Sequence, residues 1–268
     1  MLRLLTIPVA LLALLAGAMV WSSKGQGPPA DFTFTQRGDN KTLDLGVMSW
    51  MQDMRIAYAL WEGLYTPDPV TLLPIPGSAD RIETNADKTV YTFHIRDNAR
   101  WSNGEPLRAA DFQFGWRRML EQPAEYTYLH EYIKGAKDYE DAYARWKQDI
   151  AAGRKTPKPD YGMVGVEVLG EKTLRVTLAH PVPFFTSLCA FPCFFPQYEP
   201  CMRAFAQWND PDPKKRMYVA SYDEAFTRPP NLVTNGPYRL ADWSFKRRLR
   251  MIANDYYWDR AHVRSRIV

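Results

Sequence analysis

The 268-residue sequence has only three cysteines and four histidines, and it lacks the short motifs of common enzyme families. No G-x-S-x-G, H-E-x-x-H, P-loop or G-x-G-x-x-G pattern occurs in it. His94 is expected on the polar face of a strand, and Asp111 at the start of a helix. Asp53 and Glu62 are two helical turns apart. We therefore expect no catalytic residues, no metal ion and no cofactor.

The sequence also has little excess charge of either sign, with a formal net charge of +4. Its densest basic run is FKRRLR, residues 245–250. Such a run could contact phosphate or anionic lipid. We favour a solvated strand or loop, because no Gly-rich or aromatic RNA-binding signature accompanies it. Nucleic acid is not an expected partner.

Only the first residues form a long apolar run. Arg3 is followed by no charged residue until Lys24. A short basic start, a long apolar stretch and small residues near its end are typical of an export signal. The run is also long enough for a membrane anchor. We favour export, assign residues 1–23 to a signal peptide or N-terminal anchor, and expect the remainder outside the cytoplasm. Residues 24–42 are predicted to form a linker and a first strand.

The cysteines lie close together in CAFPCFFPQYEPC, at Cys189, Cys193 and Cys201. In an oxidising compartment, one disulfide and one odd thiol are a reasonable expectation. Three buried free thiols are the alternative. The spacing lacks the paired C-x2-C pattern of zinc sites.

Hydrophobic periodicity predicts a mixture of strands and helices without regular alternation. This pattern indicates a mixed α/β or α+β fold. Residues 65–77 contain four prolines and are predicted to be irregular. The expected helices are 53–64, 109–121, 126–147 and one near 202–208. The expected strands are 90–96, 164–168, 174–178, 238–243 and 249–253.

A corner between a strand and a helix stands out in YTFHIRDNARWSNGEPLRAADF. Trp101 ends the extended run, and Asn103-Gly104 supplies a tight turn. Arg108 stands where a Ser or Thr N-cap is usual, so one orphan N–H is expected to rely on Asp111 or water.

Five motifs in one collinear order resemble the extracellular solute-binding proteins of family 5, the peptide-binding subunits of ABC importers. They are WEGLY, the corner segment, VEVLGEKTLRVTLAHPVPFF, TNGPYRLADW and NDYYWD. The closest likeness is to oligopeptide-binding proteins, from about Leu43 to the C-terminus. In this family the corner helps to build a subdomain, so Trp101 is expected to be structural.

The resemblance implies a periplasmic-binding-protein-like type II fold, in which two α/β lobes close on a peptide about a hinge. Residues 43–268 correspond to the N-terminal lobe, with an inserted subdomain at about 65–183 and the second lobe missing. The implied protein is a monomer that binds peptides outside the membrane and delivers them to an ABC permease, without catalysis.

The resemblance also indicates ligand-contacting residues. The extended segment before the WEGL helix falls at Ser49, Trp50 and Met51, and Tyr126 matches a tyrosine that faces the cleft. Tyr128 could take the place of Tyr126. The alternative is that Trp50, Met51 and Tyr126 are ordinary core residues.

The sequence departs from the family pattern in three respects. Ala18 replaces the cysteine of the lipoprotein form, so lipidation there is not expected. Arg108 replaces a threonine cap. The sequence stops at Val268, where family members continue with the second lobe, and the acidic residue that binds a peptide amino terminus is expected in that missing lobe. The competing hypotheses are a binder of a nickel chelate, haem or oligosaccharide, a secreted hydrolase, and a truncated fragment without function.

Overall fold

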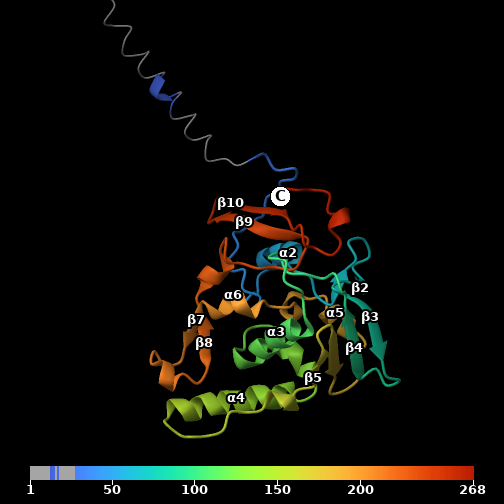
Figure 1. Cartoon of the computed structure of the whole chain (residues 1–268), viewed down its shortest axis with the longest axis vertical. Coiled ribbons are helices and arrows are strands. Elements are labelled where there is room, and N and C mark those ends of the chain that lie inside the picture. Colours follow the sequence, from blue (N-terminus) through green and yellow to red (C-terminus); the bar gives the residue numbers. More distant parts are fainter. Residues whose placement is uncertain (1–12, 16, 18–27) are drawn as a thin grey trace, which may run out of the picture.

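The computed structural model describes residues 13–15, 17 and 28–268 (Figure 1). The predicted signal peptide or anchor, residues 1–23, falls almost entirely outside the described residues. Among the described helices, none combines the length and the apolar character needed to cross a membrane.

The body of the molecule combines short helices with antiparallel strands. The α-helices are α2 (Met51–Leu60), α3 (Ala109–Glu121), α4 (Ala136–Ala151), α5 (Phe185–Leu188) and α6 (Glu199–Arg203). The strands are β1 (Tyr65–Pro67), β2 (Pro74–Pro76), β3 (Ala79–Thr84), β4 (Val90–Ile95), β5 (Val166–Gly170), β6 (Thr173–Thr177), β7 (Ala206–Trp208), β8 (Val219–Tyr222), β9 (Tyr238–Ser244) and β10 (Arg248–Ala253). This composition confirms the predicted mixed α/β class.

The largest sheet has the strand order β3-β4-β6-β5, and all its pairs are antiparallel. Its alternating burial puts Tyr91, Phe93 and Ile95 of β4 in the core, as the sequence pattern predicts. The hairpins β5–β6 and β9–β10 confirm two further predictions. In Figure 1, β9 and β10 lie at one end of the molecule and α4 at the other, with α2 and α3 between them.

The corner before α3 is buried and structural. Trp101 has no exposed surface, and its indole N–H donates to Asp111 at 3.0 Å. The same Asp111 oxygen accepts the backbone N–H of Arg108 at 2.8 Å. One carboxylate therefore caps the helix and fixes the indole, which confirms both the helix 109–121 and the structural role of Trp101.

The proline-rich segment 65–77 is more regular than predicted. β1 and β2 pair with Tyr65 opposite Pro76 and Pro67 opposite Pro74. The Asp68 N–H donates to the Leu73 carbonyl at 2.8 Å, so Asp68 and Leu73 form a hydrogen-bonded pair. The pairs that contain Pro67, Pro74 and Pro76 are therefore the non-hydrogen-bonded pairs of the ladder. Because those positions need no N–H, the prediction of irregular structure is wrong.

Three other predictions need correction. The helix expected over 126–147 is a 3-10 helix, η1 (Thr127–Tyr132), followed by α4. Gly135 separates the two with a φ of 73°, and a Cβ there would lie 2.2 Å from the Met163 carbonyl oxygen. The helix expected near 202–208 is α6 followed by β7. Residues 28–42, the described part of 24–42, contain no strand.

All three cysteines are free thiols in the structure, so the expected disulfide is not formed. Cys189 and Cys193 are buried, and burial raises the pKa of both thiols. Burial also raises the pKa of Cys201 to about 11. A raised pKa keeps the thiols protonated and therefore weakly nucleophilic.

His130 makes the stability of this fold depend on pH. The ring is fully buried and stacks on Phe194 with centroids 4.2 Å apart, and its two nitrogens have no hydrogen-bond partner among the described residues. Burial lowers its pKa to about 3. Below about pH 6.5 the His130 imidazole is protonated in the unfolded chain but stays neutral in the folded chain. The free energy of unfolding therefore falls as the pH drops from about 6.5 towards 3.

Between pH 7 and pH 5, we expect His130 to remove about 2 kcal/mol from the free energy of unfolding. Urea denaturation at both pH values measures the loss, and His130→Phe, which keeps a flat ring beside Phe194, should remove that part of it. An equal pH dependence in the variant would contradict this assignment.

Candidate functional site

The segment Ser49–Met51 leads into α2, and its position is set by the residues around Asp53. Trp50 is the N-cap residue, with extended backbone angles. Asp53, in the first turn, accepts the backbone N–H of Lys41 at 2.8 Å and the Asn40 side-chain amide at 3.1 Å. These bonds tie the chain before α2 to the beginning of the helix.

Trp50 and Met51 lie on the surface. Their relative exposures are 48% and 72%, so the alternative that they are core residues is wrong, while Ser49 is half-buried. The Lys41 ammonium lies 3.3 Å from the centroid of a Trp50 ring, a cation–π contact that orients the indole.

The backbone of this segment also offers hydrogen-bond donors, whereas its Trp50 carbonyl already accepts from Asp53 and Met54. No hydrogen bond in the described part of the chain uses the N–H groups of Ser49, Trp50 or Met51. Free N–H groups at the beginning of a helix can donate to carbonyl or carboxylate oxygens. The segment therefore combines two exposed apolar side chains, Trp50 and Met51, with backbone donors that have no partner among the described residues.

Tyr126 lies on a different element, immediately before η1. It is half-buried and meets the ring of Phe191 edge-on, with centroids 5.2 Å apart. Tyr128 is more exposed, at 56%, so both tyrosines remain candidates. Among the described residues, no hydrogen bond or aromatic contact joins Tyr126 to Ser49, Trp50 or Met51.

One exposed aromatic residue that the sequence did not indicate as part of the site is Tyr58. Tyr58, seven residues after Met51 on α2, is 37% exposed and packs edge-on against Phe195 at 5.8 Å. Burial raises the pKa of Tyr58 to about 12, with Cys193 as a second cause. Cys193 also contributes to the raised pKa of Tyr126. Tyr58 and Tyr126 therefore both lie near residues 191–195. The seven-residue spacing puts Met51 and Tyr58 on the same face of α2, so the sequence could have indicated Tyr58 as a neighbour of the site.

Three of the sequence motifs meet at Glu62, directly after α2. Its carboxylate accepts bonds from Tyr257 and Trp258 at 2.6 Å each, and from the Ser78 hydroxyl at 3.0 Å. The Asn235 side-chain amide donates to the Glu62 carbonyl at 2.8 Å. Burial raises the pKa of this carboxyl. Enclosed by donors, Glu62 holds α2 against the chain before and after β9–β10.

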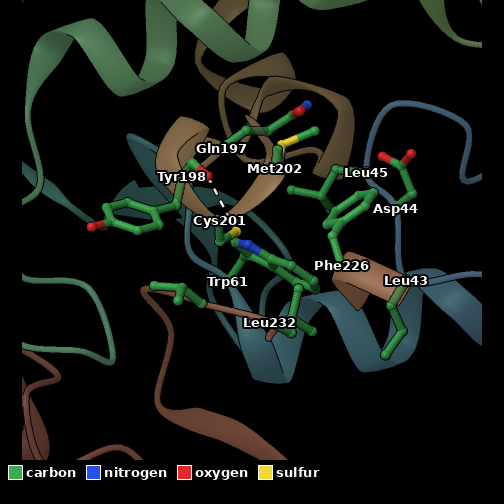
Figure 2. Close-up of a pocket in the computed structure, with 11 residues that line it drawn as sticks. Leu43, Asp44, Leu45, Trp61, Gln197, Tyr198, Cys201, Met202, Phe226 and Leu232 are labelled. Carbon is green, nitrogen blue, oxygen red and sulfur yellow. Dashed lines mark hydrogen bonds between the residues drawn. The ribbon is translucent and has the colours of Figure 1, made fainter. Parts of the chain in front are cut away.

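A small apolar pocket is lined by Trp61, Leu43, Met202 and Phe226, among others (Figure 2). Its volume of about 20 Å³ is enough for roughly one water molecule. The Cys201 thiol beside it donates to the Tyr198 carbonyl at 3.2 Å. The pocket is too small for a peptide, and the candidate site remains the segment that the family resemblance indicates, with Trp50 and Met51 exposed.

The site offers aromatic and apolar contact with backbone donors, which suits binding of an extended chain. In the described residues, no group of three or more His, Cys, Asp or Glu side chains is placed to hold a metal ion.

The family described as bacterial extracellular solute-binding proteins, family 5 Middle, matches residues 74–267. The periplasmic oligopeptide-binding protein OppA of Salmonella typhimurium is 33% identical over 221 residues, which make up 82% of this chain and 35% of the relative. This chain thus spans about a third of the length of that curated relative.

Solved structures of similar proteins share the fold. OppA of Burkholderia pseudomallei is 30% identical, with a TM-score of 0.69 over 91% of this chain and 42% of that one. The peptide-bound OppA of Listeria monocytogenes is also 30% identical, with a TM-score of 0.65 over 84% of this chain and 39% of that one.

Proposed function

The chain belongs to the bacterial extracellular solute-binding proteins of family 5, and on that ground we propose that it supplies a peptide-binding lobe of the substrate-binding component of an ABC importer. The single observation that carries the proposal is the segment Ser49–Met51, in which Trp50 and Met51 are exposed. Its free N–H groups and its exposed Trp50 and Met51 side chains match what an extended peptide needs: main-chain hydrogen bonds and tolerant apolar contacts.

In this proposal a peptide lies along Ser49–Met51, and its carbonyl groups accept from the free backbone N–H groups. Trp50 and Met51 contact its side chains, and Tyr126 contacts a further residue of the ligand from the side of Phe191. Residues 43–268 form the N-terminal lobe, with 65–183 as an inserted subdomain. Relatives named as periplasmic oligopeptide-binding proteins support a location outside the cytoplasmic membrane and delivery to an ABC permease, without catalysis.

Thermal melting of the chain from Lys24 onward, with and without a pool of tri- to pentapeptides, tests this function. This chain contains all the helices and strands from α2 onward, and a cooperative melt without ligand is the check that it folds. At 100 times its dissociation constant, a ligand adds about 2.7 kcal/mol to the free energy of unfolding. We expect an upward shift of the melting temperature that Trp50→Ala abolishes.

Trp208→Ala is the matched control, because Trp208 is also exposed, at 40%, but lies on β7. The control should keep the shift. An equal loss in both variants, or no shift with any peptide, would remove the support for a peptide site at Trp50.

A further inference from the structure

The turn between β9 and β10 presents a concentrated basic and aromatic surface. Phe245 is 58% exposed, and Lys246 and Arg247 beside it are also exposed. Lys246 has a φ of 58°, and its backbone N–H donates to Asp39 at 2.6 Å. The turn is therefore fixed against residues 33–40.

A groove of about 620 Å³ runs between this turn and residues 33–40. Phe34, Leu249 and Met251 are among its apolar lining residues. Arg37, Lys246, Arg247 and Arg248 are its basic lining residues. Phe34 stacks on the exposed Phe32, with ring centroids 6.0 Å apart, so residues 32–34 add aromatic side chains to the basic lining of the groove.

The acidic side chains near this groove make an ion pair or accept backbone hydrogen bonds. Asp242 pairs with Arg248 at 2.9 Å. Asp39 accepts the backbone N–H groups of Asn40 and Lys246, and Asp31 accepts those of Arg266 and Ile267. In residues 28–268, no carboxylate lies within ion-pair distance of Arg37, Lys246 or Arg247. Three cations on one face therefore remain available to an anionic partner.

The long apolar run of the sequence joins the molecule at this same end. Pro28 accepts a hydrogen bond from the Arg250 side chain on β10 at 2.5 Å, and the Asp31 N–H donates to the Ile267 carbonyl at 2.9 Å. Figure 1 shows this end opposite α4. Only residues 24–27 separate the chain at Pro28 from the apolar N-terminal segment.

We propose that this face, made by Phe32, Phe34, Arg37, Phe245, Lys246 and Arg247, docks on the surface of a bilayer containing anionic phospholipid. Aromatic rings and long basic side chains are the residues that settle at the headgroup level of a membrane. The guanidinium and ammonium groups bind lipid phosphates, and the rings enter the interface beside them. The apolar segment, being joined at this face, would keep it directed to the membrane.

Co-sedimentation of the chain from Lys24 onward with vesicles tests the patch without the apolar segment. We expect stronger binding to phosphatidylcholine vesicles with about 30% phosphatidylglycerol than to pure phosphatidylcholine, and its loss in about 0.5 M NaCl. Each Lys or Arg near an anionic surface contributes about fivefold in affinity. The double variant Lys246→Gln, Arg247→Gln should therefore bind about 25-fold more weakly.

The matched control is Arg145→Gln, Lys155→Gln, which removes the same charge from exposed residues in α4 and just after it, at the other end of the molecule. It should bind within about twofold of the parent. Equal binding to both vesicle types, or an equal loss in the two double variants, would overturn the proposal. If the Lys246 and Arg247 variant does not fold, Phe245→Ser makes the same test, and unchanged binding would overturn it.

Discussion

Replacing Asp44 by alanine is expected to lower the free energy of unfolding by about 3–5 kcal/mol, because the change leaves a buried guanidinium without its carboxylate. Arg118 makes two 2.6 Å hydrogen bonds to the two oxygens of Asp44. The side chains are only 6% and 8% exposed. Gln197 accepts a further bond from Arg118 at 2.9 Å. The pair fastens the chain before the candidate site to α3.

Chemical denaturation of Asp44→Ala measures this loss, and two further variants serve as controls. Asp44→Leu combined with Arg118→Met removes both charges and should recover most of the stability, because the cost arises from a single buried charge. Arg203→Ala breaks the exposed Glu199–Arg203 pair and should cost less than about 1 kcal/mol. If Asp44→Ala cost no more than Arg203→Ala, the ion pair would not hold the segment in place.

Glu62→Leu is expected to cost about 3–6 kcal/mol, because it leaves one buried and two half-buried donors without an acceptor. Those donors are the Ser78 hydroxyl, the Tyr257 hydroxyl and the Trp258 indole N–H. Arg96, stacked on Trp258 at 3.7 Å, would also lose a nearby negative charge. The end of α2 would then lose its attachment to the residues that follow β10.

Urea denaturation with Glu62→Gln as the matched variant separates the effect of shape from that of the carboxylate. Glutamine has the same size and keeps one acceptor oxygen, so Glu62→Gln should lower the free energy of unfolding by only about 1–2 kcal/mol. A Glu62→Leu variant within about 1 kcal/mol of the parent would show that the three bonds contribute little.

Local patterns in the sequence predict the elements that carry their own hydrophobic periodicity. The alternation of Tyr91, Phe93 and Ile95 gives β4, and the spacing of Phe112 and Trp116 gives α3 with its observed ends. The helix from 53 to 64 is shorter at its end because Gly236 donates to the Leu60 carbonyl at 2.9 Å. That contact comes from a distant part of the chain, which no local pattern encodes.

The interactions that sequence patterns do not predict are those between distant residues. Glu62 meets residues 173 and 195 positions away, so its role cannot follow from the spacing in WEGLY. The closeness of the cysteines in the sequence suggested a disulfide, whereas all three are free thiols in the structure. The family resemblance indicates Ser49, Trp50 and Met51 as ligand contacts. Only the structure shows that Trp50 and Met51 are exposed.

The most direct test of the peptide-binding account observes the methyl group of Met51. With methyl-labelled methionine, NMR titration of the chain from Lys24 onward with a pool of tri- to pentapeptides reports ligand contact even when binding is weak. The account predicts that the Met51 signal, identified with Met51→Leu, moves. The signal of Met217, exposed at 47% between β7 and β8, should stay in place. A stationary Met51 signal, or equal movement of both, would contradict the account.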